Sequence, residues 1–501
     1  MYDQAIINGR IYQNHTWQYK NIYLDGEKIA HISHELLPAE RIIDVKGFEV
    51  LPGMIDPHVH FELDLGWIKS VDTFETGSRA ALYGGVTSII DFLEPTDHPD
   101  ALEKAYFERR KQAEASMIDY TFHATIKSPK CDLEDYVKKM KSLGMHTLKL
   151  FTTYSDSNRR TDDEAIYELL RLSKKYHFLV LAHIENDALI TLEPSYTYKD
   201  LLKSRPSLAE TSEALKLASF VKETGGYLYM VHLSSGFTLE ALIQSYQDII
   251  GTHLFLETCP QYLLFDASVW NQDQGYLYTF APPLRTKEEQ ELLKKNIGSI
   301  QTIGTDHCAF MKKDKQKATL KEIPLGVGGI ESSLSLMRAL MGDEAIDKMS
   351  ERVAMIQGLR QKGKLEIGYD ADIIFVKPHL YLIGEPHATS DYSMYTGLEG
   401  YGEVITTMIR GQIVYHNHKV FPHTGRWIEG SDITFWKHLF MLAIMISHPI
   451  NRMSIFALMK RLSIWVRWKI SFLTMRMRSS IKQAISFYPA WSVVIPISIP
   501  H

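Results

Sequence analysis

The residues best suited to metal chemistry begin with His58 and His60, which follow the largely apolar segment 51–57. Alternate side chains of a β-strand point to the same face, so the two imidazoles are expected to project together from one strand end. Two neighbouring imidazole nitrogens form part of a typical site for a divalent metal ion. A histidine pair at this spacing is also typical of a structural role, so the interpretation depends on further ligands.

Further candidate ligands lie near the ends of other apolar segments, and they are Lys149, His183, His232 and Asp306. Taken singly, each has a structural explanation, such as a histidine at the edge of the core or a lysine whose amine reaches solvent. Together with the first pair they form a set of four histidines, one lysine and one aspartate. Such a set favours a metal site if the fold brings the segment ends together.

The elements that must position these residues repeat as apolar strand, loop and amphipathic helix. Helices are predicted at 161–175 and 207–223, the second with a capping box of Ser207 and Glu210. The predicted strands are 55–58, 88–92, 120–126, 147–154, 178–183, 228–232, 254–259 and 302–306. Eight strands, each followed by a helix, predict an α/β fold of the TIM-barrel type, whose chemistry gathers at the carboxyl ends of the strands. A doubly wound open sheet is the alternative, but no GxGxxG motif follows the first strand.

Short β-strands are predicted at both ends of this region. Residues 5–9 and 21–29 are typical of strands, with a hairpin turn at Asp25-Gly26, and similar segments occur at 370–376 and 404–414. We therefore predict a small β-sandwich that is built from two parts of the chain, residues 1–50 and 365–427. The TIM barrel, residues 51–364, would be inserted between them.

The ligand types indicate which ion the site would take. Imidazole and carboxylate groups suit Zn²⁺, and Mn²⁺, Fe²⁺ or Co²⁺ could occupy the same ligands. Lys149 does not fit as an ammonium, because it is a cation without a lone pair. A lysine that has reacted with CO₂ is a carbamate, an anion whose two oxygens can bridge two metal ions. Carboxylation would therefore turn Lys149 from a misfit into a possible metal ligand.

Seven motifs occur in a fixed order: 52–60 (PGMIDPHVH), 149–154 (KLFTTY), 182–186 (AHIEN), 231–235 (VHLSS), 257–263 (ETCPQYL), 281–285 (APPLR) and 304–308 (GTDHC). This set resembles the amidohydrolase superfamily and, within it, the D-hydantoinase and dihydropyrimidinase family of cyclic amidohydrolases. The resemblance runs from residue 1 to about 427. It implies a TIM barrel with a β-sandwich from both termini, two metal ions bridged by a carboxylated lysine, and a homotetramer.

The resemblance also implies a role for each candidate residue. His58, His60 and Asp306 would hold the more buried metal ion, and His183 and His232 the more exposed one. Carboxylated Lys149 and a hydroxide would bridge the two ions. Asp306 would accept the proton of the attacking hydroxide and return it to the ring nitrogen. The hydroxyl of Tyr154 would stabilise the tetrahedral oxyanion.

The substrate is less well defined by these motifs. Related dihydroorotases carry an arginine soon after the histidine pair, whereas acidic residues follow here, which disfavours an anionic ring. Leu63 and Leu65 are predicted either to face an apolar ring substituent or to pack beneath their loop. Ala281 and Ser332 stand where the family commonly has serine and asparagine, and we predict that both contact the cyclic amide through main-chain groups.

The activity implied is the opening of hydantoins or dihydropyrimidines to N-carbamoyl amino acids. An allantoinase, or another hydrolase of cyclic amides or imides, is an alternative with the same metals. A non-catalytic assembly protein is a second alternative, because the family includes relatives that have lost the metal ligands. All six ligand positions are filled in this chain, which argues against the assembly role.

The composition of the chain indicates its general class. The chain has 501 residues, of which 45% are hydrophobic, a net charge of −5, and three cysteines. We expect a large protein without affinity for nucleic acid, without a disulfide framework and without an integral membrane span. No secretory signal is visible near the N-terminus, so a cytoplasmic location is predicted. The small-molecule substrate and other copies of the chain are the expected partners.

The segment 428–501 differs from the rest, because no Asp or Glu occurs after residue 434 while Lys, Arg, Met and Trp recur. One interpretation is a cationic amphipathic segment on a membrane surface. The other, which we favour, is a stretch that lies outside the evolved reading frame. Charges and prolines interrupt its apolar runs, so it does not resemble a membrane span. We expect it to form an atypical basic and apolar tail outside the barrel.

Overall fold

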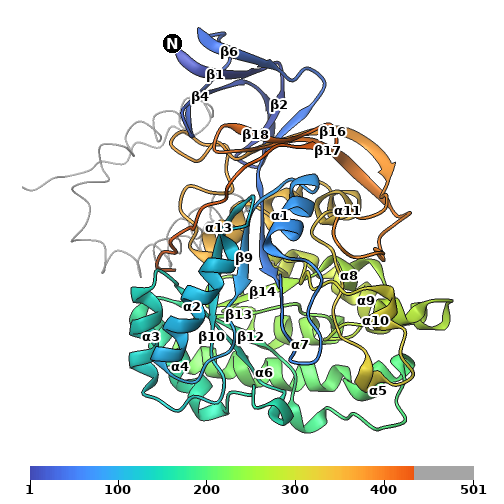
Figure 1. Ribbon diagram of the computed structural model, residues 1–501. Helices are drawn as coiled ribbons and strands as arrows, with labels where there is room; N and C mark the ends of the chain where they lie inside the picture. Colours follow the sequence, from blue (N-terminus) through green and yellow to red (C-terminus); the bar gives the residue numbers. More distant parts are fainter. Residues whose placement is uncertain (434–501) are drawn as a thin grey trace, which may run out of the picture. The chain divides into compact units, whose positions relative to one another are not determined.

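The central element is a parallel sheet of eight strands that follow one another in chain order (Figure 1). The computed structural model describes residues 1–433. A bridge between Val59 and His307 brings the first and last strands together. The sheet is therefore a nearly closed TIM barrel, which confirms the predicted α/β class. The strands are β8 (Met54–Val59), β9 (Val86–Phe92), β10 (Asp119–Thr125), β11 (Thr147–Phe151), β12 (Leu179–His183), β13 (Leu228–Met230), β14 (Leu254–Thr258) and β15 (Thr302–Ile303).

Helices follow every strand of the barrel and cover its outside (Figure 1). Several begin at a side-chain cap, for example α3 at Asp132 and α4 at Asp162. The helices are α1 (Phe74–Tyr83), α2 (Pro99–Ala113), α3 (Leu133–Ser142), α4 (Asp163–Tyr176), α5 (Leu201–Ser204), α6 (Ser207–Thr224), α7 (Gly236–Tyr246), α8 (Pro260–Leu264), α9 (Lys287–Lys295), α10 (Lys312–Lys315), α11 (Ser333–Met341), α12 (Glu344–Lys348) and α13 (Glu351–Gln357).

The predicted capping box at the start of α6 is wrong. Ser207 is the first helical residue, the cap position is Pro206, and no side chain caps this helix. The carboxylate of Glu210 instead accepts hydrogen bonds from the backbone amides of Ser234 (3.2 Å) and Ser235 (3.0 Å). Glu210 is fully buried, so satisfying it within the fold outweighs capping its own helix.

Three predicted strands are too long at their carboxyl ends. The segments 147–154, 228–232 and 302–306 leave the sheet after Phe151, Met230 and Ile303. In each case a residue with positive φ follows within three positions of the strand end, at 154 (70°), 232 (41°) and 306 (52°). A left-handed residue cannot continue a strand, so the chain turns at these positions.

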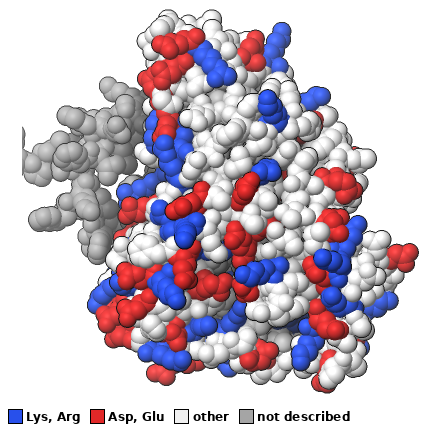
Figure 2. Space-filling model, in the orientation of Figure 1, with Lys and Arg blue, Asp and Glu red and all other residues white. Residues whose placement is uncertain are grey.

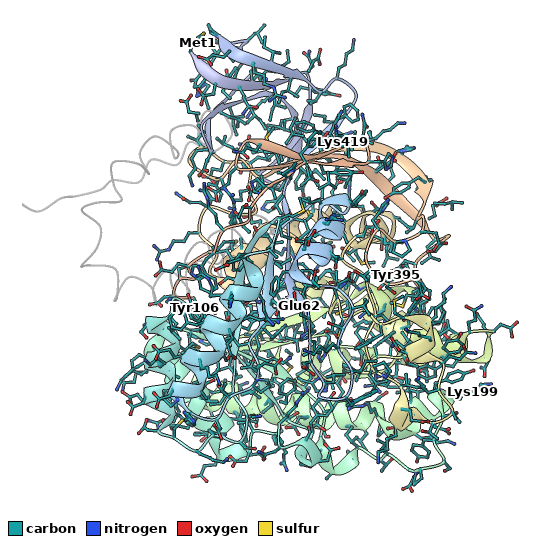
Figure 3. The ribbon with its side chains drawn as sticks, viewed as in Figure 1. Met1, Glu62, Tyr106, Lys199, Tyr395 and Lys419 are labelled. Atoms are coloured by element: carbon teal, nitrogen blue, oxygen red, sulfur yellow. The ribbon has the colours of Figure 1, made fainter. Side chains whose placement is uncertain are left out.

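Two further sheets contain the β-rich ends of the chain. The four-stranded sheet has the order β5-β4-β1-β6, and the seven-stranded sheet the order β19-β18-β17-β16-β7-β2-β3. Figure 3 marks Met1 and Lys419 in these sheets, with Tyr106 and Lys199 among the helices around the barrel. The strands are β1 (Tyr2–Ile7), β2 (Arg10–Gln13), β3 (Thr16–Tyr19), β4 (Asn21–Asp25), β5 (Lys28–Ser33), β6 (Ala39–Asp44), β7 (Glu49–Pro52), β16 (Ile373–Leu382), β17 (Glu399–Ile409), β18 (Gln412–His416) and β19 (Lys419–Val420).

The two β-rich ends form one β-sandwich, as predicted. In the seven-stranded sheet, β16 pairs with β7, and β7 pairs with β2, so strands from both ends of the chain are neighbours. A separate apolar core fills the space between the sheets, and it includes Ile22, Val50 and Ile373. The predicted turn at Asp25-Gly26 joins β4 to β5, which pair antiparallel.

A buried ionic network connects the β-sandwich to the barrel. The ammonium of Lys362 lies 2.6 Å from Asp119 at the start of β10, and 2.7 Å from Asp372 just before β16. The ammonium of Lys362 also lies 2.9 Å from Asp370, and the guanidinium of Arg410 pairs with Asp119. The three aspartates are close enough to hold a metal ion. The lysine ammonium occupies this space, so the cluster serves as a link between the domains.

Residues 426–433 lie against the barrel. The carbonyl of Arg426 accepts the amide of Tyr120, and the amide of Ile428 donates to the carbonyl of Tyr120. The amide of Gly430 donates to the carbonyl of Gly144, and the amide of Ile433 donates to the carbonyl of His177. The described chain therefore continues on the barrel past residue 427. The rest of the predicted tail, from residue 434 onward, lies outside the described residues.

The surface in Figure 2 carries lysine and arginine interspersed with aspartate and glutamate. Among the helices of residues 1–433, none combines the length and apolar character that a membrane crossing requires.

Candidate active site

Three candidate ligands converge at the carboxyl end of β8 and just beyond β15. The Oδ1 atom of Asp306 lies 3.1 Å from Nε2 of His58 and 3.1 Å from Nε2 of His60. One ligand atom from each residue lies within 4.8 Å of the others. Burial alone would raise the pKa of the Asp306 carboxyl, but the two imidazoles hold it well below its usual range. A carboxylate between two imidazole nitrogens is a suitable donor set for a divalent ion.

The other two histidines face each other beyond β12 and β13. Nδ1 of His183 lies 3.0 Å from Nε2 of His232. The rings of His232 and His58 are 5.4 Å apart, so this pair is adjacent to the first cluster. Burial lowers the pKa of both imidazoles. The histidines are therefore neutral, which is the form that binds a metal.

Lys149 on β11 is fully surrounded by protein. Its ammonium lies 5.4 Å from the ring centre of Phe92 and 5.2 Å from that of Phe151. Within residues 1–433 no carboxylate lies at ion-pair distance from it. Burial lowers the pKa of this amine to about 8. A buried amine without a counter-ion is unusual in a folded protein and needs an explanation.

Tyr154 lies beside this set. Its ring centre is 5.2 Å from that of His183, and the guanidinium of Arg205 lies 5.0 Å from the ring. Burial raises the pKa of the phenol, although the arginine opposes that effect. The hydroxyl is therefore protonated at neutral pH and can donate a hydrogen bond.

Backbone turns place several of these side chains. Tyr154, His232 and Asp306 all have positive φ, which costs energy for residues with a side chain. Each occurs just after a barrel strand, where the turn directs the side chain over the carboxyl end of the sheet. Strain of this kind is typical of functional positions.

Comparison with known proteins agrees with this geometry. The model of the amidohydrolase family matches residues 50–414. The D-hydantoinase of Geobacillus stearothermophilus is 30% identical over 458 residues, which cover 85% of this chain and 96% of that protein. The chain belongs to the amidohydrolase family. The D-phenylhydantoinase of Escherichia coli O81 (strain ED1a) is 31% identical over 419 residues, covering 78% of this amidohydrolase and 89% of the relative.

Solved structures give the same result. The dihydropyrimidinase of Brevibacillus agri NCHU1002 superimposes with a TM-score of 0.81 at 28% identity, covering 86% of this amidohydrolase and 99% of that chain. The L-hydantoinase of Arthrobacter aurescens gives 0.75 at 25% identity, covering 86% and 100%. Within the family, this amidohydrolase groups with the hydantoinases and dihydropyrimidinases. Its neighbours include proteins named for both enantiomers.

Glu257 on β14 has a supporting position that the sequence analysis did not assign. Its Oε1 lies 2.7 Å from Nδ1 of His58 and accepts the backbone amide of His232 at 3.0 Å. Its Oε2 accepts the hydroxyl of Tyr229 at 2.7 Å. One carboxylate therefore orients a histidine of each group. A role for Glu257 could have been predicted from its position inside the apolar strand sequence LFLET, because a buried acid is rare without a partner.

Glu185 and Arg205 form a second support. Nε2 of His183 lies 2.6 Å from the Glu185 carboxylate, which also pairs with Arg205. If Nε2 donates its proton to Glu185, Nδ1 presents a lone pair toward His232. Arg205 precedes α6 and carries no sequence pattern that links it to β12, so only the fold could reveal it.

The predicted substrate contacts are more dispersed. Leu63 and Leu65 are half-buried in the loop after β8, which Ser70 ties to the carbonyl of His60 at 3.0 Å. Ala281 is half-buried and precedes Pro282, whose carbonyl accepts the Tyr262 hydroxyl at 2.8 Å. Their contact with substrate stays a prediction.

Ser332 follows a loop that contacts the neighbour of Asp306, because the amide of Gly329 donates to Nδ1 of His307 at 3.2 Å. It is the residue before α11 and lines a cavity against the segment 381–393. None of the six candidate ligands lines that cavity. The contact of Ser332 with substrate stays a prediction.

Proposed function

We propose that this protein is a metal-dependent hydrolase that opens hydantoins or dihydropyrimidines to N-carbamoyl amino acids. The observation that carries the proposal is the convergence of four histidines, an aspartate and an unpaired lysine at the carboxyl ends of the barrel strands. The relatives named D-hydantoinase and dihydropyrimidinase support the same substrate class.

The donor set fits two divalent ions, and we expect zinc. His58, His60 and Asp306 would hold one ion, and His183 and His232 the other. Asp306 and Glu257 raise the pKa of His58 to about 9 against the effect of burial, so a bound ion would replace a proton there. The facing nitrogens of His183 and His232 are too close for two lone pairs unless a cation or a proton lies between them.

Carboxylation would account for the unpaired Lys149. The neutral amine attacks CO₂, forming an N–C bond and releasing one proton, and the product is a carbamate anion. Its negative charge would be stabilised by the two proposed divalent ions, whereas an ammonium at this position has no carboxylate at ion-pair distance within residues 1–433. The lowered pKa of the amine supports this reaction, because more of the group is unprotonated near pH 8.

The residues of the chain have separate tasks in ring opening. When bound, divalent ions supply Lewis acidity, which lowers the pKa of water and polarises a carbonyl. The Asp306 carboxylate would accept the proton of the attacking water and return it to the departing ring nitrogen. The Tyr154 hydroxyl would donate to the oxygen of the tetrahedral intermediate.

Two finer expectations have different grounds, since the homotetramer comes from the family resemblance and the cytoplasmic location from the small number of cysteines. We expect a homotetramer in the cytoplasm, as predicted from the sequence. The neighbours named for D- and L-hydantoins leave the preferred enantiomer to experiment. An allantoinase activity uses the same metals, so it belongs in the same assay.

The test is ring opening by purified protein loaded with Zn²⁺ or Mn²⁺ in bicarbonate. Loss of ultraviolet absorbance would be followed for dihydrouracil, hydantoin, a 5-aryl hydantoin, allantoin and dihydroorotate. We expect turnover of one of the first three, abolished by a chelator. A protein that binds two metals and opens none of the five rings would contradict the proposed substrate class. Failure to bind metal would favour the assembly role.

A further inference from the structure

A cavity of about 270 Å³ has none of the six candidate ligands among its lining residues, although His307, the neighbour of Asp306, lines it. Its walls come from the end of α1, the loop 328–332 and the segment 381–393, with β17 and β18 behind them. Figure 1 shows α1 and α11 beneath these strands. The volume corresponds to about nine water molecules, and it is close to that of the smallest ligand pockets.

Apart from tyrosines, the ionisable residues of the cavity wall are three glutamates and three histidines, His307, His387 and His418. Glu331, Glu385 and Glu403 line it, and no lysine or arginine is among its lining residues. Glu331 pairs with His387, and Glu403 lies 2.9 Å from His379. Glu385 makes no ion pair or hydrogen bond within residues 1–433. The wall therefore offers an uncompensated carboxylate to a ligand.

Aromatic rings form much of the remaining wall. The ring of Tyr83 stacks on His387 with centres 3.8 Å apart, and Tyr415 lies 4.7 Å from Tyr83. Tyr381 is held by a hydrogen bond of 2.8 Å from its hydroxyl to Ser335. Electron-rich rings beside carboxylates attract organic cations, because the ring face and the carboxylate both favour positive charge.

We propose that this cavity binds a small organic cation with an apolar, planar body, such as an aromatic amidine or amine. The acidic wall selects the charge, and the tyrosines contact the apolar body. None of the six candidate ligands and neither Tyr154 nor Ala281 lines the cavity, whereas Ser332 and His307 do, so the variants described below separate binding here from binding at the candidate active site. The proposal does not depend on the ring-opening activity.

The test compares two molecules of the same shape by isothermal titration calorimetry on the full chain. Benzamidine carries an amidinium, and benzamide is its neutral counterpart. We expect one benzamidine to bind per chain, and at least about fivefold tighter than benzamide. Equal affinity for the two molecules would overturn the selection for charge. Absence of saturable heat with millimolar benzamidine would overturn the site.

Variants assign the binding to this cavity. Glu385→Gln and Tyr381→Leu should each weaken benzamidine binding about fivefold, whereas Tyr381→Phe, which keeps the ring, should bind as the parent does. Glu399→Gln removes an exposed glutamate of β17 outside the cavity and serves as the matched control. His183→Ala should also bind normally. Loss of binding in His183→Ala, with Glu385→Gln unaffected, would move the ligand to the active site and overturn the proposal.

Discussion

At the scale of single residues, the site depends on groups that do not touch the metal position. A carboxylate bonded to Nδ1 of a histidine fixes the tautomer and increases the electron density at Nε2. Glu257 has this role for His58 and also holds the backbone of His232. A change at Glu257 should therefore disturb both groups of ligands at once.

We expect Glu257→Gln to lower metal affinity about 10- to 100-fold, because the amide no longer offers a charged acceptor to His58. Competition with a chromophoric chelator measures the affinity. Glu291→Gln, on the exposed face of α9, is the control and should match the parent. A variant with parental metal affinity would show that Glu257 supports only the fold.

Lys149→Ala should lose bound metal and activity together, because the proposed bridging carbamate cannot form. Short-chain carboxylates such as acetate should restore part of both, since they can occupy the space of the missing side chain. Metal content by atomic emission and turnover on the best ring substrate are the measurements. A metal-replete, fully active variant would refute the bridging role.

At the scale of elements, the end of β15 packs tightly against β14 and β8 beside the ligands. A Cβ atom on Gly304 would lie 2.6 Å from Oε2 of Glu257 and 3.0 Å from Cβ of His58. Glu257 cannot move aside freely, because His58, Tyr229 and the backbone of His232 all bond to it. Glycine is thus required at the end of β15 by lack of space.

Gly304→Ala should therefore displace the Glu257 carboxylate and reduce metal affinity, with a smaller loss of thermal stability. We expect kcat/KM to fall by at least about tenfold, since the ligands of the two proposed ions shift relative to each other. The control is Gly298→Ala, because a Cβ there meets no atom within 4 Å. Equal kinetics in the two variants would contradict this account.

The strands of the barrel were predictable because each is an apolar run between polar loops, and all eight occur in the structure. The positions at which three of the strands end were not predictable, because Tyr154, His232 and Asp306 have positive φ and no local sequence pattern indicates this conformation. The ligand candidates were visible as residue types at strand ends. Arg205 was not, because its contact with Glu185 depends on how the loop before α6 folds over the barrel.

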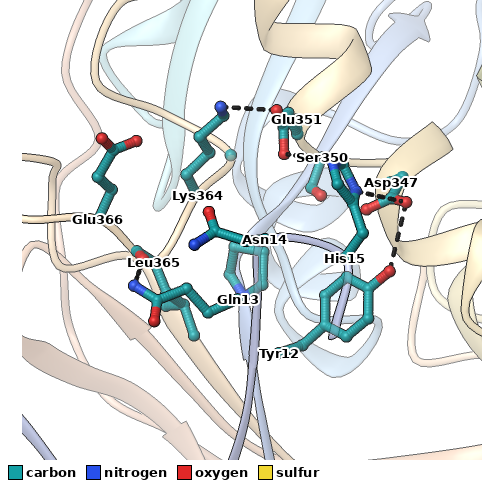
Figure 4. A pocket seen from close by; sticks show the side chains of 12 residues that line it. Tyr12, Gln13, Asn14, His15, Asp347, Ser350, Glu351, Lys364, Leu365 and Glu366 are labelled. Carbon is teal, nitrogen blue, oxygen red and sulfur yellow. Dashed lines mark hydrogen bonds and ion pairs between the residues drawn. The ribbon is translucent and has the colours of Figure 1, made fainter. Parts of the chain in front are cut away.

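At the scale of the whole molecule, a second contact joins the seven-stranded sheet to the helices of the barrel domain. His15, in the turn between β2 and β3, lies 3.0 Å from Asp347 on α12 and 4.0 Å from Glu351 on α13 (Figure 4). Lys364 pairs with Glu351 at 2.6 Å. The hydrogen bond to Asp347 raises the pKa of His15 above 6.5, although burial opposes it.

This link should depend on pH. Because the folded state binds the proton more tightly, the stabilisation is fully present below pH 6.5 and is lost as the pH rises through the folded pKa. We expect His15→Gln to lower the melting temperature at pH 5.5 but not at pH 9. The corresponding loss in free energy of unfolding should be less than about 1 kcal/mol, because the side chain is half exposed. His34→Gln, at an exposed position, is the control. A pH-independent difference would exclude the ionic origin.

The segment 426–433 places a constraint on the order in which this protein folds as it is made. Its backbone bonds reach Tyr120, Gly144 and His177, which lie at or before the starts of β10, β11 and β12. A chain emerging from the ribosome exposes those three strands long before residues 426–433 are synthesised. The whole barrel, residues 51–364, is therefore synthesised before the segment that covers this end of three of its strands.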